Sequence, residues 1–370
     1  MEALQPLKPG GWVGFNKPQE GAKVRMYCFY GAGGTAAMFQ PWYKIMAKEF
    51  PEVELCAVEW PGRANHEGEF ITDAKQWIAD FRDKVINAAR KEWFGAPFVF
   101  LAQSTGARLA YDLIRELKKD RIEPLKMYVV ARSPPIVPDA KWIDEAPDDT
   151  MDYMNWITEE LLESAKEKLL PLWQRLPKED LQKREKQFRS DLALNASPVA
   201  PLGSTAWKVV APEGKLVKRN FPTSDKMIQI KRDVGLTLQT TGQEFVGPSG
   251  GKWVELDPEA GEKNRGWLLV HGKTVGVNSE LLEVVVPEGG DSFWKTSVPL
   301  QIHVSDTDRI QPWNDSSGRL LPQVEWAQLT MQEPEFVHYK GLIHDEFLMH
   351  PNVVDNVCKD IIGTCKLRDS

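Results

Sequence analysis

The alternation of short apolar runs with amphipathic stretches between Val24 and Pro135 constrains the fold of this chain more than any other feature. Four runs are short and apolar enough to be buried strands: Val24–Phe29, Val53–Glu59, Phe98–Ala102 and Met127–Ala131. Apolar residues between them recur at the helical spacings of three and four, as in Trp77, Phe81, Val85 and Ala88 and in Leu109, Leu113 and Leu117. This alternation predicts a parallel sheet covered by helices on both faces.

A purely helical segment follows, and then a segment made of β-type runs. From Asp148 to Leu194 apolar residues keep helical spacing and no strand pattern interrupts them, which indicates a cap over a site. From about Ser204 to Trp294 five short β-type runs are separated by Gly, Pro, Asn and Asp turns, which predicts a small barrel. The five runs are Trp207–Ala211, Met227–Lys231, Leu236–Thr240, Trp253–Leu256 and Trp267–Val270.

The buried-strand pattern then resumes, so the β segment reads as an insertion. Val298–Val304 and Glu335–Tyr339 are strand-like, and Val353–Ile362 has the pattern of a closing helix. The chain has 370 residues, more than one compact core usually holds. We therefore expect an α/β domain made of residues 1–203 and 295–370, with a lid at about 148–194 and an inserted β domain at 204–294.

A serine lies between a predicted strand and a predicted helix. The strand Phe98–Ala102 runs into Ala102-Gln103-Ser104-Thr105-Gly106, and the helical repeat begins at Leu109. A strand, a sharp turn and a helix, with small residues two before and two after the serine, is the form of a nucleophile elbow. The amide of Thr105, at the start of the helix, can face a developing oxyanion. The alternative is that Ser104 only caps the helix.

Candidates for an acid and a base follow the last predicted strands. A serine is a weak nucleophile without a base, and the α/β-hydrolase order along a chain is serine, acid, histidine. Asp306 and Asp308 follow the run 298–304, and His344 follows the run 335–339, so these groups lie beyond carboxyl ends of strands. Among six histidines, His344 is the one in a loop after the last strand, whereas His303 and His338 lie inside strand patterns and are expected to serve packing. We expect His344 as the base and Asp308 as the acid, with Asp306 as the alternative.

The first predicted strand ends in a glycine-rich loop, Tyr30-Gly31-Ala32-Gly33-Gly34-Thr35. Glycines let backbone amides approach a ligand closely, and in α/β-hydrolases an early strand-end loop supplies the second oxyanion donor. A phosphate-binding loop is the competing interpretation, but the segment lacks the Gly-Lys-Ser/Thr ending of such loops.

Together these residues resemble the type II thioesterases that accompany polyketide and non-ribosomal peptide synthases, and the related chain-terminating thioesterases of fatty-acid synthesis. The matching stretches are Cys28–Trp42, Glu59–Arg63, Ala102–Gly106, Ala131–Pro135, Phe188–Leu194, Ser305–Asp308 and His344. The resemblance implies an α/β-hydrolase fold with a mostly parallel sheet, with Ser104 as nucleophile, Asp308 as acid and His344 as base. It also implies that the amides of Ala32 and Thr105 form the oxyanion hole, and that the segment 148–194 is a mobile helical lid that shapes the acyl pocket.

The chain departs from the family pattern beside the expected nucleophile and base. Ala102, Gln103 and Thr105 stand where the family usually has Gly, His and Met, and Leu342-Ile343 precede His344 where the family usually has two glycines. Because these positions line the site, the departures put the substrate range in doubt. The candidate pocket residues are Gln103, Trp156, Trp173 and Leu342. For Trp156 and Trp173, packing within the core or lid is the alternative.

The β insertion lies outside the resemblance to thioesterases. Its tryptophan-bearing runs are similar to bacterial-type SH3-like modules, so we expect an SH3-like β-barrel domain at 204–294. Such a module could bind a further protein or act as a spacer.

The resemblance implies hydrolysis of acyl thioesters, through an acyl-enzyme intermediate and without a metal or cofactor. The expected substrate is an acyl group on the phosphopantetheine arm of an acyl carrier protein, or acyl-CoA. One alternative is an esterase, amidase or acyltransferase of the same fold, and another is a catalytically idle scaffold that binds through the insertion. Carrier proteins are usually acidic, so docking requires local basic residues. The candidates are Arg63, Lys183, Arg184, Lys186 and Arg189, which could equally form a solvated helix face.

Composition narrows the classes of partner. A net charge of −7 argues against a nucleic-acid binder. The chain has no apolar run of 18 residues, so we expect no membrane span. The start, Met1 to Asn16, does not read as a signal peptide. Four scattered cysteines suit reduced side chains rather than a disulfide framework or a zinc cluster. We therefore expect a cytoplasmic protein.

Overall fold

The computed structural model describes residue 7 and the ranges 11–16, 22–64, 66–132, 144–195, 206–220, 226–246, 251–257, 266–285, 295–308 and 326–365. The chain divides into two compact units. The first comprises Met1–Leu117, Ile122–Val199 and Thr296–Ser370, and the second comprises Lys118–Arg121 and Ala200–Lys295. The expected module limits, residues 204 and 294, lie outside the described ranges, as do residues 133–135 of the fourth family-like stretch.

A seven-stranded sheet forms the centre of the first unit. Its order is β1-β3-β2-β4-β5-β13-β14, and every neighbouring pair is parallel except β1 with β3. The strands are β1 Val13–Asn16, β2 Val24–Phe29, β3 Val53–Val58, β4 Phe98–Gln103, β5 Met127–Val130, β13 Leu300–Ser305 and β14 Glu335–Tyr339. The predicted parallel sheet is confirmed, because β2, β3, β4, β5 and β13 are buried along their whole length, as their apolar runs required. The sequence analysis did not predict the short antiparallel strand β1.

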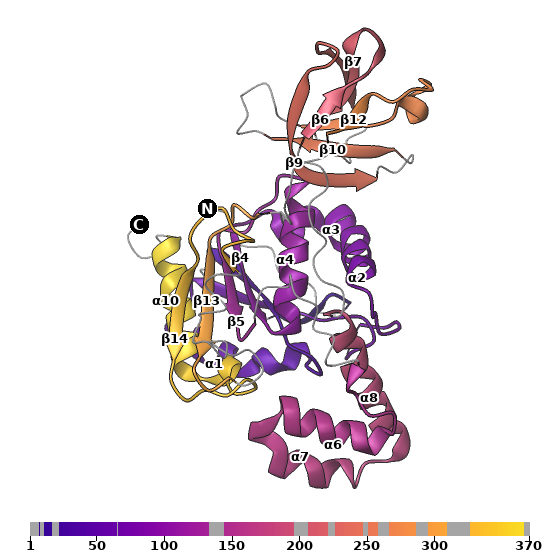
Figure 1. Cartoon of the computed structure of the whole chain (residues 1–370). Helices are drawn as coiled ribbons and strands as arrows, with labels where there is room; N and C mark the ends of the chain where they lie inside the picture. The colour runs from indigo at the N-terminus through magenta and orange to yellow at the C-terminus, as the bar shows by residue number, and fades with distance from the viewer. Residues whose placement is uncertain are drawn as a thin grey trace. The chain divides into compact units, whose positions relative to one another are not determined.

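Helices cover both faces of this sheet (Figure 1). One face carries α1 Gln40–Glu49 and α10 Pro351–Thr364, and the other carries α2 Ala74–Phe81, α3 Ala88–Phe94 and α4 Thr105–Lys118. The leucine repeat of α4 is fully buried, as its spacing predicted. The repeat Trp77, Phe81, Val85, Ala88 fails at its last member, because a π-helical turn, Arg82–Asn87, joins α2 to α3. This turn rotates the following residues, so Ala88 is exposed and Trp93 is buried in α3 instead.

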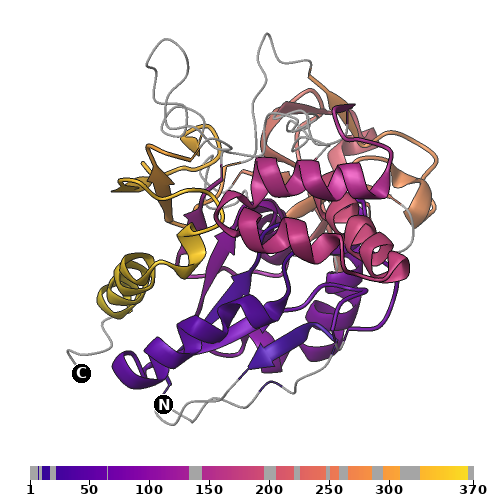
Figure 2. The same cartoon turned by 90° about the horizontal axis from the view of Figure 1, so that it is seen from below.

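The segment from 148 to 194 is helical throughout, as predicted. It forms α6 Thr150–Leu161, α7 Lys166–Trp173 and α8 Lys178–Ala193, whose ribbons lie side by side in magenta and rose in Figure 2. The side chain of Asp149 caps α6 by accepting hydrogen bonds from the amides of Met151 and Asp152. The three helices share one apolar cluster that includes Met154, Ile157, Leu161, Trp173, Leu181, Phe188 and Leu192.

The second unit is an antiparallel seven-stranded sheet in the order β12-β6-β9-β10-β11-β7-β8. All five predicted runs contribute strands, and β7 and β12 were not predicted. The strands are β6 Ala206–Val209, β7 Lys215–Arg219, β8 Met227–Lys231, β9 Thr237–Val246, β10 Lys252–Leu256, β11 Trp267–Leu269 and β12 Leu282–Val284. Trp207, Trp253 and Trp267 lie in the apolar core of this unit. The SH3-like character of the unit stays a prediction.

Three observations on the described residues concern membrane-spanning helices, metal-binding groups and the cysteines. None of the described helices is both long and apolar enough to cross a membrane. Within the described ranges, no three His, Cys, Asp or Glu side chains are grouped to hold a metal ion. All four cysteines are free thiols, and Cys28, Cys56 and Cys358 are buried.

Candidate active site

Ser104 occupies a strained turn between β4 and α4. Its φ is +49°, in the left-handed region that non-glycine residues avoid at a cost of about 1–2 kcal/mol. Hydrogen bonds hold the turn in place, from the amide of Ser104 to the carbonyl of Val130 (3.1 Å) and from the amide of Ala107 to the carbonyl of Ser104 (3.0 Å). A serine in this conformation is the local geometry that the sequence motif predicts.

The small residues around Ser104 are required by close packing. A Cβ atom on Gly106 would lie 2.5 Å from the carbonyl oxygen of Tyr30 and 2.6 Å from that of Phe29. Both contacts are to backbone atoms, which cannot move aside as a flexible side chain can. Ala102 is completely buried at the end of β4. The start of α4 therefore packs directly onto the end of β2, which places the glycine-rich loop beside the serine.

His344 lies between Ser104 and Asp308. Its Nε2 is 3.2 Å from Oγ of Ser104, and its Nδ1 is 3.1 and 3.2 Å from the two carboxylate oxygens of Asp308. The exposed fractions of the three residues are 7%, 6% and 3% for Ser104, His344 and Asp308. Ser104 follows β4, Asp308 follows β13 and His344 follows β14, as expected from the sequence.

The other histidines and the alternative acid lie in different surroundings. Asp306 accepts a hydrogen bond from the amide of Gly341 at 3.0 Å. His303 is fully buried between Tyr339 and Gln301, and burial lowers its pKa to about 3, so it is a neutral packing residue as predicted. His338 is exposed on the edge strand β14, so the packing prediction is wrong for this residue.

The loop after β2 passes directly beside the serine. A Cβ atom on Gly31 would lie 3.1 Å from Cβ and 3.7 Å from Oγ of Ser104. Ala32 follows in this loop, and Thr105 is the fully buried first residue of α4. The two expected oxyanion donors thus flank Ser104 from neighbouring strand ends, because β2 pairs with β4.

Gln103 and Leu342 contact the histidine loop. Nε2 of Gln103 donates to the backbone carbonyl of His344 at 3.4 Å, while its Oε1 is buried and accepts from no described residue. The carbonyl of Leu342 accepts from the hydroxyl of Thr307 at 3.0 Å. Gln103 thus contacts the backbone of His344, and Leu342 links the histidine loop to the loop after β13.

A cavity of about 750 Å³ lies between the glycine-rich loop and the lid helices. Ala32, Gly33 and Gly34 form one wall, and Trp173 forms part of the opposite wall. The other apolar lining residues include Leu162, Leu169, Leu172, Leu176 and Phe188, and exposed Lys183 and Arg184 border the cavity. Trp156 is half-buried against the apolar cluster of the lid.

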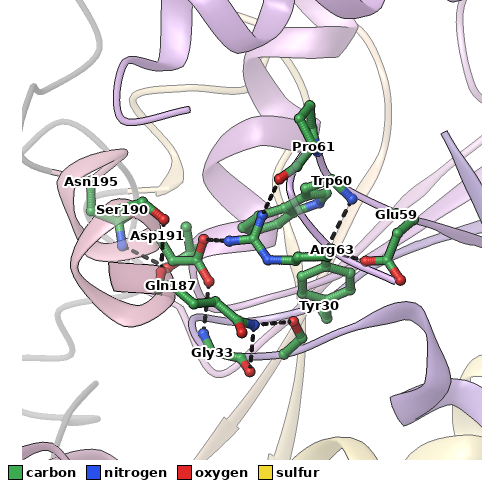
Figure 3. Close-up of polar contacts among 12 residues, drawn as sticks. Tyr30, Gly33, Glu59, Trp60, Pro61, Arg63, Gln187, Ser190, Asp191 and Asn195 are labelled. Atoms are coloured by element: carbon green, nitrogen blue, oxygen red, sulfur yellow. Dashed lines mark hydrogen bonds and ion pairs between the residues drawn. The ribbon is translucent and has the colours of Figure 1, made fainter. Parts of the chain in front are cut away.

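Arg63, expected as an exposed docking cation, is buried instead. Its guanidinium forms an ion pair with Asp191, and it lies 5.0 Å from the ring centre of Trp60 (Figure 3). Burial raises the pKa of Asp191 to about 6, opposed by Arg63 and by the amide of Gly33, which donates to Asp191 at 2.8 Å. Of the other expected cations, Lys186 pairs with Glu69 and Arg189 with Glu185.

The lid also contacts the loop of the histidine. Both the amide and the hydroxyl of Ser164, between α6 and α7, donate to the carboxylate of Asp345, at 3.2 and 2.6 Å. Asp345 directly follows His344 in the chain. Neither the contact of Ser164 with Asp345 nor the ion pair of Asp191 with Arg63 was predicted from the sequence. Asp191 nevertheless lies inside the family-like stretch Phe188–Leu194.

Comparisons with known proteins identify the family to which the sequence is similar. A model of the thioesterase domain family matches residues 24–214, just over half of the chain. The gramicidin S biosynthesis protein GrsT of Aneurinibacillus migulanus is 31% identical over 122 residues, which are 32% of this chain and 44% of that protein. A probable cadicidin biosynthesis thioesterase of Streptomyces griseus is 26% identical over 138 residues, 37% of this chain and 36% of that protein. The chain thus spans less than half the length of these relatives.

Solved structures with the same fold include two proteins from NRPS/PKS pathways. ClbQ from the colibactin NRPS/PKS pathway superposes with a TM-score of 0.53 at 12% identity, covering 94% of this chain and 100% of that one. The type II thioesterase YbtT from the yersiniabactin NRPS/PKS pathway superposes with a TM-score of 0.50 at 13% identity, covering 98% and 96%. At such identities the likeness shows the α/β-hydrolase-like fold alone, and the sequence match carries the family. The chain therefore belongs to the thioesterase domain family.

Proposed function

We propose that this protein hydrolyses acyl thioesters carried on the phosphopantetheine arm of a carrier protein, with Ser104, His344 and Asp308 as the catalytic triad. The observation that carries the proposal is the imidazole of His344, which lies within hydrogen-bond distance of Oγ of Ser104 on one side and of the Asp308 carboxylate on the other. This is the arrangement by which a histidine activates a serine.

In the first half of the reaction, Nε2 of His344 takes the proton from Oγ of Ser104 as the oxygen attacks the thioester carbonyl. Asp308 stabilises the imidazolium and holds its Nδ1 proton toward the carboxylate. The tetrahedral intermediate then collapses, the carbon–sulfur bond breaks, and the imidazolium returns its proton to the leaving thiol. The product of this half is an acyl ester of Ser104.

In the second half, His344 removes a proton from water as the water attacks the acyl ester. Collapse of the second intermediate releases the carboxylic acid and returns the proton to Ser104. In both halves the carbonyl oxygen becomes negative, and the amides of Ala32 and Thr105 are our candidates to stabilise it. Loss of one such donor typically costs roughly a hundred- to a thousandfold in rate.

The cavity beside the glycine-rich loop supports an acyl substrate. Most of the lid residues that line it are apolar, although Asp180, Lys183, Arg184 and Gln187 also line it. The cavity reaches Ala32 in the loop that flanks the serine. We place the acyl chain or the pantetheine arm in this cavity. Lys183 and Arg184, which border it and are exposed, suit an anionic phosphate or an acidic carrier surface.

A panel of substrates tests the proposal: acyl groups of several lengths on a carrier protein, on coenzyme A and on a small thiol, with free acid as the readout. We expect hydrolysis, and we expect Ser104→Ala and His344→Ala each to reduce kcat by at least about a thousandfold, because triad members act as a unit. If oxygen esters turn over faster than every thioester, the protein is an esterase of the same fold. If the acyl group passes to an added amine or alcohol rather than to water, it is an acyltransferase.

A fluorophosphonate probe separates an enzyme from a catalytically idle scaffold. An active site of this type reacts covalently at the serine oxygen, whereas a scaffold leaves the probe unreacted. Labelling of the wild type that disappears in Ser104→Ala supports the proposal. No labelling and no hydrolysis of any substrate would contradict it.

A further inference from the structure

One face of α8 carries a row of buried polar side chains. Gln187, Asp191 and Asn195 are spaced by four residues, so they lie above one another on the same side of the helix and of the turn that ends it. Their exposed fractions are 6%, 0% and 2%. Burial of polar groups costs free energy unless they form hydrogen bonds. The hydrogen-bond partners of these three side chains therefore indicate their role.

Gln187 and Asp191 bind the backbone of the glycine-rich loop, and Asn195 binds the side chain of Thr105. Nε2 of Gln187 donates to the carbonyls of Gly33 and Gly34, both at 2.9 Å, and Asp191 accepts from the amide of Gly33. Nδ2 of Asn195 donates to the hydroxyl of Thr105 at 2.8 Å. Figure 3 shows the row of α8 facing the glycine-rich loop. Gln187 and Asp191 thus hold the segment that contains Ala32, and Asn195 holds Thr105.

Close packing between Gly33 and Phe188 also joins the glycine-rich loop to α8. Gly33 has a φ of +74°, and a Cβ atom there would lie 2.0 Å from a ring carbon of Phe188 on α8. A side chain at position 33 would therefore require the ring of Phe188 to move away from the loop. The helix therefore presses an aromatic ring on the loop at the point where its polar row binds the loop.

A second set of contacts, made by Glu59 and Arg63, binds the glycine-rich loop and α8. The carboxylate of Glu59, at 1% exposure, accepts from the hydroxyl of Tyr30 at 2.7 Å and from the amide of Ala36 at 3.2 Å. These two partners lie at the two ends of the glycine-rich loop. Arg63, four residues after Glu59, binds Asp191 and the carbonyl of Pro61. The family-like stretch Glu59–Arg63 thus connects the ends of the loop with the polar row of α8.

We propose that Gln187, Asp191 and Asn195, supported by Arg63, are positioning residues that hold the two oxyanion-donating segments at a fixed distance from Ser104. This inference rests on the proposed function, because it assigns a role in the same reaction. Amide donors stabilise a developing charge only if they are oriented before the reaction begins. A misplacement of about 1 Å can cost roughly a hundredfold in rate. The loop contains three glycines and has no such rigidity of its own.

The test is Gln187→Glu, with Gln182→Glu as the matched control. Both changes replace an amide by a carboxylate on α8, but Gln182 is exposed and Gln187 is buried. At position 187 a carboxylate can donate to neither carbonyl, and a protonated carboxyl can donate to only one of the two. Three quantities are measured for each variant: kcat and KM on a small soluble thioester, the rate of fluorophosphonate labelling at Ser104, and Tm.

We expect Gln187→Glu to lower kcat and the labelling rate together, by about 10- to 100-fold. Because Gln187 also lines the cavity in which we place the substrate, a change in KM alone does not support the positioning role. Gln182→Glu should stay within about twofold of the wild type in all three quantities. Gln187→Met, which removes the donor without adding a charge, is the second variant if the first does not fold. Parallel losses in this variant, with Tm close to that of the wild type, support the proposal.

Equal kcat and equal labelling rates in folded Gln187→Met and wild type would overturn the positioning role. A fall in Tm alone would also overturn it, because a merely structural residue moves stability without moving the labelling rate. The labelling readout keeps this inference separate from the proposed function. A wild type that is labelled but hydrolyses no thioester contradicts the proposed function, while the variants still test the positioning role. A wild type that does neither contradicts both.

Discussion

Asp306 and Asp308 stand two residues apart in the loop after β13, yet they bind different partners. The carboxylate of Asp308 lies 3.1 Å from Nδ1 of His344, whereas the carboxylate of Asp306 accepts from the backbone amide of Gly341. One carboxylate lies beside the candidate base, and the other binds the turn that leads to it.

We expect Asp308→Asn to lower kcat by about a thousandfold or more, because the imidazole loses its charged partner and can adopt the wrong tautomer. Asp306→Asn keeps an oxygen that can accept from Gly341, so its loss should stay within about tenfold. Steady-state kinetics on one soluble thioester compares the two variants. A larger loss in Asp306→Asn would mean that the acid is assigned to the wrong residue.

Gly106→Ala should damage the protein far more than a second helical glycine replacement. At Gly106 the new Cβ atom would lie 2.5 Å from a backbone oxygen, whereas at Gly363 in α10 it would meet no atom within 4 Å. We expect Gly106→Ala to lower the free energy of unfolding by about 1–3 kcal/mol and to reduce activity. Gly363→Ala should instead raise it by about 0.5–1 kcal/mol, since alanine favours the helix. Urea unfolding of both variants measures the difference, and equal effects would refute the close packing at the serine turn.

The buried carboxylate of Asp191 should make stability depend on pH with a defined sign. Burial raises its pKa from 3.8 to about 6 in the folded state, with Glu59 adding to the rise and Arg63 opposing it. The folded state therefore holds this proton more tightly than the unfolded state. The contribution to stability is full below about pH 4 and is lost as the pH rises through about 6, a change of roughly 3 kcal/mol.

Asp191→Asn lacks this titration and serves as the reference. We expect the stability of the wild type relative to Asp191→Asn to fall as the pH rises from 4.5 to 7, measured by urea unfolding at each pH. A difference that stays constant over this range would show that Arg63 keeps the carboxylate charged throughout.

Replacement of residues 204–294 by a short Gly/Ser linker should leave the catalytic unit folded. The triad candidates and the lid all belong to the first unit, whereas the second unit has its own apolar core. An inserted domain must leave and rejoin its host without unravelling it. We expect the rate on a small soluble thioester to survive within about tenfold, and loss of soluble protein would contradict separability.

The same variant tests what the inserted unit does. In the wild type, the inserted unit exposes several large apolar side chains, including Met227, Ile228, Val234 and Leu236. A selective fall in rate on a carrier-protein substrate would make the unit a docking element. Equal relative rates on both substrates would make it a spacer or a site for a different partner.

The central sheet, apart from its short edge strand β1, and the order of the chemical groups could be predicted from the sequence. Buried parallel strands need continuous apolar runs, so β2, β4, β5 and β13 could be predicted from short windows of sequence. Ser104, Asp308 and His344 each follow such a strand, and parallel strands bring their carboxyl ends to one edge. The structure accordingly places these three side chains within hydrogen-bond distance of one another.

Which polar groups are buried together could not be predicted from the sequence. The sequence suggested Arg63 as an exposed cation, but its partner Asp191 lies 128 residues further along the chain, and the pair is almost completely excluded from solvent. The i, i+4 spacing of Gln187, Asp191 and Asn195 was visible in the sequence, but not the loop that they bind. A local pattern records which side chains share a face of a helix. Which backbone that face meets depends on how the whole chain packs, because the desolvation of polar groups is compensated only by partners that folding brings from distant segments.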